Sequence, residues 1–322
     1  MMRVSTSFSH YSALLHIQQG QSRVNQYLEQ VGTGRLGGDL KSFAAQAETL
    51  MASRQVQLRT EAHLATNHAL SARLLVQDEA LSKVQKGAEA ALAAVNQALA
   101  SNDGSALLDA LQAAMDEAAG GLNTSYSGSY LFSGGHVDTP PVAILKLEDL
   151  DDPPPPPPDL PTPRPNPFAN GNLPGQHRVD DDTLLTTGLL ADELASPLFD
   201  ALADVAALPP AGSGEPLTGD FGAPLTAEQH EFLQGLMSKL SAAATHVTTL
   251  RASNGALQAR VEATTTDLTE RKAMLEGLLA DVTAADPLEA AARLDAARTS
   301  LQAAAEAFNA LKESSLLNIL RR

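Results

Sequence analysis

The stretch from residue 287 to residue 320 constrains the fold more than any other part of the chain. Its apolar residues alternate at spacings of three and four, at Leu294, Ala297, Leu301, Ala304, Phe308 and Leu311. This a/d heptad seam is typical of a helix that packs along its length against partner helices. Asp286 supplies an acidic cap, and Pro287 stands at the first helical position. We therefore predict a C-terminal helix that begins at Pro287.

Both ends of the chain predict amphipathic helices that need partners. The C-terminal helix closes on the apolar residues Leu316, Leu317, Ile319 and Leu320, and chain ends usually fray unless they are tied down. Residues 5–32 predict an N-terminal helix with one apolar stripe at Val4, Phe8, Tyr11 and Leu15 and another at Val24, Leu28 and Val31. Gly32 and Gly34 end this helix. Either the two helices complete a monomeric bundle, or other copies of the chain complete them.

Two long segments between the ends predict a helical rod. In residues 40–99 the only glycine or proline is Gly87. A spacing of three and four continues there at Leu81, Val84, Ala88, Leu92, Val95 and Leu99. The second segment, 226–282, opens on Thr226 with Gln229 three residues later, which is a capping box. Because these segments are far apart in the sequence, the rod has to be assembled from both.

The region between these segments differs in composition. A shorter helix is predicted over residues 105–122, and a glycine-flanked aromatic cluster at 126–135 predicts a short strand or hairpin. Residues 141–223 hold 16 of the 19 prolines and 14 acidic residues against three basic ones, which predicts an exposed, extended insert. Within it we predict one short helix, over residues 197–208. A PxxP ligand for a signalling domain is a weaker interpretation, because any proline run satisfies that pattern.

Charge and composition exclude several classes of protein. The net charge of −16 argues against general nucleic-acid binding, because phosphate contacts need Lys and Arg. Without cysteine, the chain has neither disulfides nor a thiol nucleophile. No window reaches the roughly 20 apolar residues of a membrane span, and the N-terminus lacks the apolar run of a signal peptide. We expect no membrane association and, if the protein acts outside the cell, export without a cleaved signal.

No catalytic or metal-binding constellation is found in the sequence. The eight histidines are scattered, and His63 and His68, five residues apart, fall on different faces of a helix. The acidic run at 180–182 lacks the spaced ligands and the closing Glu of a calcium loop. The glycine-containing loops lack the Lys-Ser/Thr of a phosphate loop, and no G-x-S-x-G elbow occurs. We therefore expect no enzyme activity, no cofactor and no metal.

Several short motifs point to one family of bacterial proteins. Residues 2–8 read MRVSTSF, residues 32–35 GTGR, and residues 128–142 GSYLFSGGHVDTPPV, which is the most specific. Residues 251–260 follow the pattern R-x-x-x-G-A-x-x-x-R, and residues 315–320 read SLLNIL. In these motifs the chain resembles the flagellin superfamily, and within it the hook-associated members. The similarity covers residues 2–142 and 226–320 and leaves out the proline-rich insert.

The residues and the resemblance together predict a mainly α, flagellin-like fold. It consists of a long antiparallel helical rod and terminal coiled-coil helices, with a small irregular or β outer insert. The predicted domains are a terminal coiled-coil assembly domain (1–36 plus 287–322), a helical rod domain (37–140 plus 224–286) and a proline-rich acidic outer domain (141–223). The predicted assembly interface comprises Val4, Phe8, Tyr11, Leu15, Leu294, Leu301, Phe308, Leu311, Leu316, Leu317 and Ile319. The predicted rod packing motif comprises Tyr130, Phe132, Arg251, Gly255 and Arg260.

The resemblance also implies a function. Such proteins are structural subunits that pass unfolded through the flagellar export apparatus and form a homo-oligomeric ring at the junction between hook and filament. Their partners would be a neighbouring hook-associated protein, flagellin and an export chaperone. Two alternatives remain at this point: a filament-forming flagellin, against which the GSYLFSGG segment argues, and an adhesin that presents the insert on a helical stalk.

Overall fold

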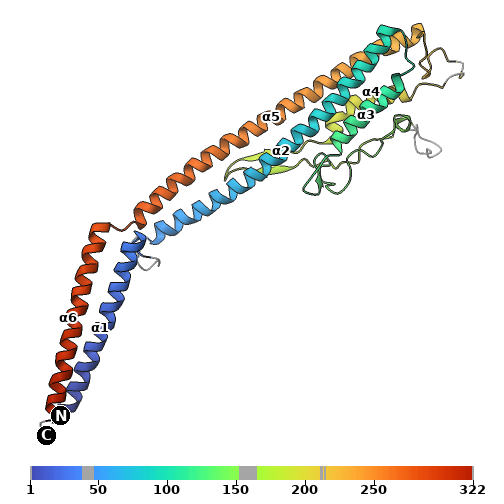
Figure 1. The fold of residues 1–322 in the computed structure, drawn as a ribbon. Coiled ribbons are helices and arrows are strands. Elements are labelled where there is room, and N and C mark those ends of the chain that lie inside the picture. The colour runs from blue at the N-terminus through green and yellow to red at the C-terminus, as the bar shows by residue number, and fades with distance from the viewer. Residues whose placement is uncertain (1, 38–46, 152–164, 211–212, 214, 321–322) are drawn as a thin grey trace. The chain divides into compact units, whose positions relative to one another are not determined.

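The chain forms two compact units, of which unit 1 is built from the two ends of the sequence and unit 2 from the continuous stretch between them. The computed structural model describes residues 2–37, 47–151, 165–210, 213 and 215–320, without the side chains of 2–10, 311 and 314–320. Unit 1 comprises residues 1–61 and 270–322, and unit 2 comprises residues 62–269. The helices α2 (Ala47–Ser101) and α5 (Ala227–Thr283) contribute to both units (Figure 1).

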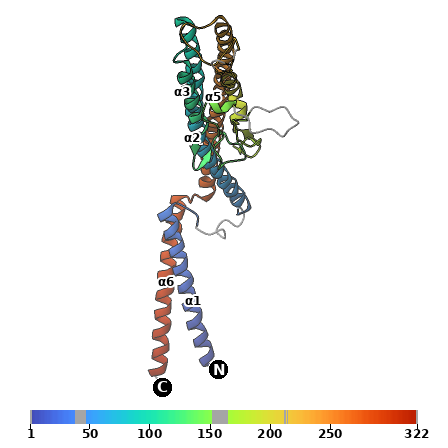
Figure 2. The same cartoon turned by 90° about the vertical axis from the view of Figure 1, so that its right-hand side faces the viewer.

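Unit 1 is organised around the helices at the two ends of the chain. α1 (Met2–Thr33) and α6 (Pro287–Leu320) lie side by side and antiparallel (Figures 1 and 2). α1 is followed directly by Gly34, whose φ of 66° is the left-handed conformation that favours glycine and ends the helix. α6 begins at Pro287, and the Asp286 carboxylate accepts the backbone N–H of Leu288 at 2.8 Å. Both predicted terminal helices are therefore confirmed, and so is the predicted cap by Asp286 at the start of the C-terminal helix.

Backbone hydrogen bonds join the segment after α1 to the end of α5 and the connection between α5 and α6. The N–H of Leu36 donates to the carbonyl of Thr283, and the N–H of Ala285 donates to the carbonyl of Gly34, both at 2.9 Å. The buried side chain of Gln30 donates from Nε2 to the carbonyl of Leu36 at 2.6 Å. These bonds hold the two connecting loops of unit 1 together.

Unit 2 has one main hydrophobic core between α2, α3 (Leu107–Leu122), α4 (Ala191–Ala206) and α5. Its largest fully buried side chains include Leu81, Leu111, Phe132, Phe199 and Leu233. The capping box predicted at the start of α5 is present: the N–H of Gln229 donates to Thr226 Oγ1 at 3.2 Å, and the N–H of Thr226 donates to Gln229 Oε1 at 3.0 Å. Two backbone N–H groups at the start of the helix are thereby satisfied.

The described strands form small antiparallel pairs beside these helices. β1 (Ser125–Tyr126) pairs with β2 (Ser129–Tyr130), at the position of the predicted hairpin. β3 (Gln176–Arg178) pairs with β4 (Leu184–Thr186), and η2 (Glu148–Leu150) is a short 3-10 helix. The predicted mainly α fold, with long helices and little β structure, is therefore confirmed for the described residues.

The insert takes part in the core of unit 2 as far as it is described. Val142, Leu147 and Leu150 are buried in that core, and so is the apolar face of α4. The proline run, which was expected to be extended, lies outside the described residues. The division into three domains stays a prediction.

α4 begins earlier than the sequence predicts. The predicted start was Pro197, but the helix starts at Ala191 and contains Pro197. A proline inside a helix deprives the carbonyl four residues earlier of its donor. Here that carbonyl belongs to Glu193, and it accepts a hydrogen bond from His246 Nε2 on α5 at 2.8 Å. The partner from α5 explains how the helix continues through the proline.

Replacing His246 with Ala is expected to lower the free energy of unfolding by about 0.5–1 kcal/mol, because the Glu193 carbonyl loses its donor. In a Pro197→Ala background, residue 197 has an N–H that can take over, so the same replacement should cost less. Urea unfolding of the single and double variants measures this coupling. Equal costs in the two backgrounds would contradict the assignment.

Close packing of α3 on α2 depends on glycine. A Cβ atom at position 87 would lie 2.6 Å from the carbonyl oxygen of Ala114, and one at position 121 would lie 2.8 Å from that of Ala80. Both contacts are with backbone atoms, which cannot move aside independently. Gly87 on α2 and Gly121 on α3 therefore set the distance between the two helices.

Gly87→Ala is expected to destabilise unit 2 by about 1–3 kcal/mol, because the added methyl group forces α3 away from α2. Gly120→Ala is the matched control: it lies in α3 with nothing within 4 Å of an added Cβ, so its better helix propensity should be neutral or stabilising. Thermal unfolding of both variants measures the difference. A Gly87→Ala variant as stable as Gly120→Ala would show that the helices can separate without cost.

Candidate assembly surface

The heptad seam of α6 packs against α1 of the same chain. Leu294 and Ala297 are buried, and Leu301 and Phe308 are half-buried. A Cβ atom added to Gly20 of α1 would lie 3.1 Å from Leu301 Cδ1, so the two helices are in direct contact there. At least part of the seam is therefore covered without a second copy of the chain.

Some predicted interface residues lie in these helices without described side chains. They are Val4 and Phe8 on α1, and Leu311, Leu316, Leu317 and Ile319 on α6. Their assignment to an assembly interface stays a prediction.

α1 has a second set of apolar side chains that α6 does not cover. We call Tyr11, Leu14, Leu15, Leu28 and Val31 the α1 apolar surface. Tyr11 is 66% exposed and Leu15 is 40% exposed. A pair of helices buries one stripe on each, so a further stripe needs further helices. Tyr11, Leu14 and Leu15 lie within about one turn of α1, and exposed apolar groups that are neighbours in this way mark an interaction surface.

A groove of about 290 Å³ runs between α1 and α6. Small residues line it from both helices, including Ala13, Gly20, Ala304 and Ala307. Small side chains allow the two helices to approach closely there.

The aromatic motif of the predicted rod packing set docks onto α4. Phe132 is fully buried, and its carbonyl accepts the N–H of Ala191 at 3.0 Å. Gly134 has a φ of 59°, and a Cβ atom there would lie 2.3 Å from the carbonyl oxygen of Gly171. The glycine after the buried aromatic is therefore required by both conformation and space. Tyr130 is half-buried in β2.

The predicted motif on α5 divides into one packed residue and two exposed ones. Arg251 donates from Nε and Nη2 to the two carboxylate oxygens of Asp78 at 3.0 and 3.1 Å, and from Nη1 to Gln85 Oε1 at 3.2 Å. This bidentate pair joins α5 to α2. Gly255 and Arg260 are exposed, and an added Cβ at position 255 meets nothing within 4 Å.

A buried asparagine that the sequence analysis did not single out lies beside this pair. Asn254 donates from Nδ2 to the carbonyl of Leu74 at 3.2 Å, and its Oδ1 accepts from Gln77 Nε2 at 3.1 Å. In the sequence, Asn254 can be recognised as the polar member of an otherwise apolar series of period seven. The members of this series, all buried, are Leu240, Val247, Asn254, Val261 and Leu268. A polar residue at such a position specifies the register between packed helices.

The β3–β4 hairpin is fixed to α2 by side-chain amides. Asn67 Nδ2 donates to the carbonyl of Val179 at 3.1 Å, and Gln77 Nε2 donates to that of Thr187 at 3.2 Å. Val179 and Leu185 also pack in a small hydrophobic cluster with Leu70, Leu74 and Val261. Polar and apolar contacts together hold the hairpin on the helices.

His177 on β3 is held in its neutral form. Its Nδ1 lies 2.7 Å from Thr187 Oγ1. Burial lowers the pKa of His177 below its ordinary value, and the positive charge of Arg73 on α2 lowers it further. Because the folded-state pKa lies below the unfolded one, His177 stabilises unit 2 above pH 6.5 or so, and this contribution is lost as the pH falls through the folded-state pKa.

His177→Gln is expected to reduce the loss of stability between pH 7 and about pH 5.5, because the group that resists protonation is gone. Urea unfolding midpoints at both pH values measure the effect. His68→Gln makes the same change at an exposed position of α2 and serves as the control. An unchanged pH dependence in His177→Gln would contradict the assigned role of this histidine.

Among the described residues, no helix combines the length and the apolar character needed to cross a membrane. In the same residues, no three His, Cys, Asp or Glu side chains are grouped so that they could hold a metal ion.

The long paired helices and the terminal-helix surface define a flagellin-like helical fold. Residues 237–320, which include most of α5 and all of α6, match the family model of the bacterial flagellin C-terminal helical region. A Vibrio parahaemolyticus protein assigned as flagellar hook-associated aligns over 76% of this chain and 100% of its own, with 12% identity and a TM-score of 0.57. Bacillus cereus FlgL aligns over 72% of this chain and 99% of its own, with 15% identity and a TM-score of 0.50. These similarities concern the fold, and no curated protein matches the chain.

Proposed function

We propose that this chain is a structural subunit of the bacterial flagellum that forms the junction between hook and filament, as a protein of the flagellar hook-associated protein 3 type. The observation that carries the proposal is the exposed α1 apolar surface on a helix paired with a flagellin-type C-terminal helix. The fold shared with a hook-associated protein and with FlgL supports the same role.

Assembly would proceed by burial of the α1 apolar surface. Terminal helices of neighbouring copies pack on it, and each Å² of apolar area removed from water contributes about 25 cal/mol. The proposed interface includes Tyr11 and Leu15, which are exposed, together with the undescribed side chains of Val4, Phe8, Leu311, Leu316, Leu317 and Ile319. Copies arranged around an axis then form a ring.

The proposal includes a location and partners. The protein acts outside the cell, at the hook–filament junction, after export without a cleaved signal peptide. A hook-associated protein lies on one side of the ring and flagellin on the other. Before assembly, an export chaperone covers the apolar helix surfaces. The role is structural, without catalysis.

Immunogold labelling of intact flagella tests the proposal directly. Label confined to the distal end of the hook is expected, and deletion of the gene should leave hooks without attached filaments. Label along the whole filament would instead identify a filament-forming flagellin.

A further inference from the structure

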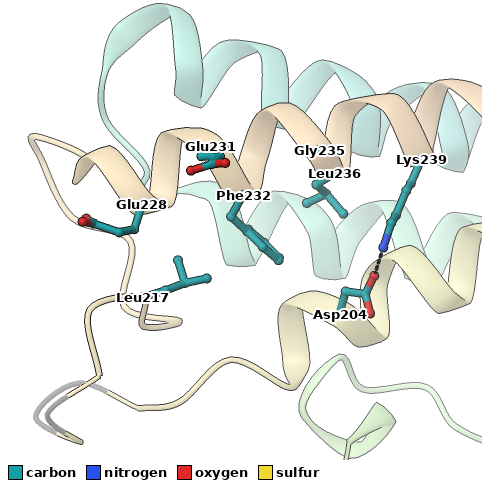
Figure 3. A pocket seen from close by; sticks show the side chains of 8 residues that line it. All are labelled: Asp204, Leu217, Glu228, Glu231, Phe232, Gly235, Leu236 and Lys239. Atoms are coloured by element: carbon teal, nitrogen blue, oxygen red, sulfur yellow. Dashed lines mark hydrogen bonds and ion pairs between the residues drawn. The ribbon is translucent and has the colours of Figure 1, made fainter.

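Unit 2 has an open groove of about 430 Å³ where α5 begins. Phe232 and Leu236 on α5 and Leu217 on the preceding loop form its apolar part (Figure 3). Leu236 is buried, whereas Phe232 and Leu217 remain half-exposed. The groove therefore offers an apolar surface that the described residues do not fill, with a volume typical of binding pockets.

The charges around this groove are mostly negative. Glu228 and Glu231 line it and are exposed, and neither makes an ion pair within the part of the chain that the structure describes. Lys239 is the cation of the lining, and it donates to the Asp204 carboxylate across the end of the groove (Figure 3). Its charge is thus compensated by Asp204. Two carboxylates remain to attract a positive group.

A glycine in the wall keeps the groove open. Gly235 lies inside α5 and is exposed, and a Cβ atom added to it would meet nothing within 4 Å. Glycine inside a helix costs about 0.5–1 kcal/mol relative to Ala. At Gly87 close packing of α3 requires the absence of a side chain, whereas at Gly235 none of the described residues lies within 4 Å of an added Cβ. A side chain of a bound partner therefore has access to the α5 backbone at this point.

We propose that this groove binds a segment of a partner protein in which an Arg or Lys stands next to a large apolar side chain. The apolar side chain packs on Phe232 and Leu217 over the Gly235 backbone, and the cation lies between the carboxylates of Glu228 and Glu231. Arg and large aromatic side chains are enriched at protein interfaces. An acidic segment is rejected by the same carboxylates. The proposal goes beyond the junction role and does not depend on it.

The experiment uses the full chain labelled with ¹⁵N and the blocked peptide acetyl-Leu-Arg-Leu-Arg-amide at up to about 5 mM, since a short peptide binds weakly. We expect the amide signals of Phe232 and Gly235 to shift on addition of this peptide. The peptide with Glu in place of Arg should leave them unchanged. The variant Glu228→Gln with Glu231→Gln should weaken binding about fivefold, as expected for two exposed ion pairs.

Matched variants separate the groove from general effects. Gly235→Leu should abolish binding by filling the groove, whereas Gly120→Leu, at an equally open helical glycine of α3, should not. Glu262→Gln with Glu270→Gln removes the same charge from exposed positions of α5 and should leave binding unchanged.

Three results would overturn the proposal. The first is the absence of shifts at Gly235 with the Arg peptide, and the second is equal binding of the Glu peptide. The third is concentration-dependent self-association that Gly235→Leu abolishes, because the occupant would then be a second copy of this chain. Light scattering at the concentration of the titration tests the third.

Discussion

Tyr11→Asp combined with Leu15→Asp is expected to abolish incorporation of the protein into flagella while the isolated chain still folds. In the isolated chain both positions are exposed to water, at 66% and 40%, so the carboxylates stay hydrated. In the proposed assembly the same positions are buried against neighbouring copies. A buried, unpaired carboxylate costs several kcal/mol, and this cost recurs at each contact in a ring.

Two measurements separate assembly from folding in this experiment. Swimming motility and labelling at the end of the hook report incorporation, and circular dichroism of the purified chain reports helix content. Gln18→Asp combined with Gln21→Asp places the same two charges at exposed polar positions of α1 and should leave both readouts unchanged. Normal motility of the double variant would mean that the α1 apolar surface is not an assembly contact. Loss of helix content would instead assign these residues to folding.

Phe132→Ala is expected to lower the free energy of unfolding of unit 2 by about 3–5 kcal/mol, the usual cost of truncating a buried Phe. The ring is fully buried in the main core. Its backbone carbonyl accepts the first N–H of α4, so a shift of this loop also removes a partner from the helix start. The cavity and the disturbed helix start act in the same direction.

Urea unfolding followed by circular dichroism measures this loss. Leu173→Ala is the control, because Leu173 also lies outside the helices of unit 2 but is 75% exposed, and its truncation should cost little. A loss below about 1 kcal/mol for Phe132→Ala would mean that the core collapses around the missing ring without penalty.

The exposed apolar residues of α1 allow assembly to be tested separately from folding. Sequence periodicity left open whether the α6 seam is completed within the chain or by other copies. Leu294 and Ala297 are buried in unit 1, so a change there affects folding and assembly together. Tyr11 is exposed, so a change there can affect assembly alone.

The sequence by itself determined the features that depend on consecutive residues. Helix starts were readable at Pro287 and Thr226, because the caps are made by side chains within three residues of the helix start. The helical state of the long segments followed from the near absence of glycine and proline, and the α6 seam from its spacing. Phe132, from the motif predicted to pack the rod, is buried, and its assignment to rod packing stays a prediction.

Only the tertiary structure decided which faces are covered and by what. The predicted α2 stripe included Leu92 and Leu99, but Ala91 and Ala98 are the buried residues, while both leucines remain half-buried. Packing of α3 through Gly87 favours small residues on that face. The sequence predicted that Pro197 starts a helix. Its actual position inside α4 depends on His246, which supplies a hydrogen-bond donor to the freed Glu193 carbonyl and is distant in sequence. A cap or a periodic stripe is a local property, whereas burial and the partner of a freed carbonyl depend on segments that meet only in the folded chain.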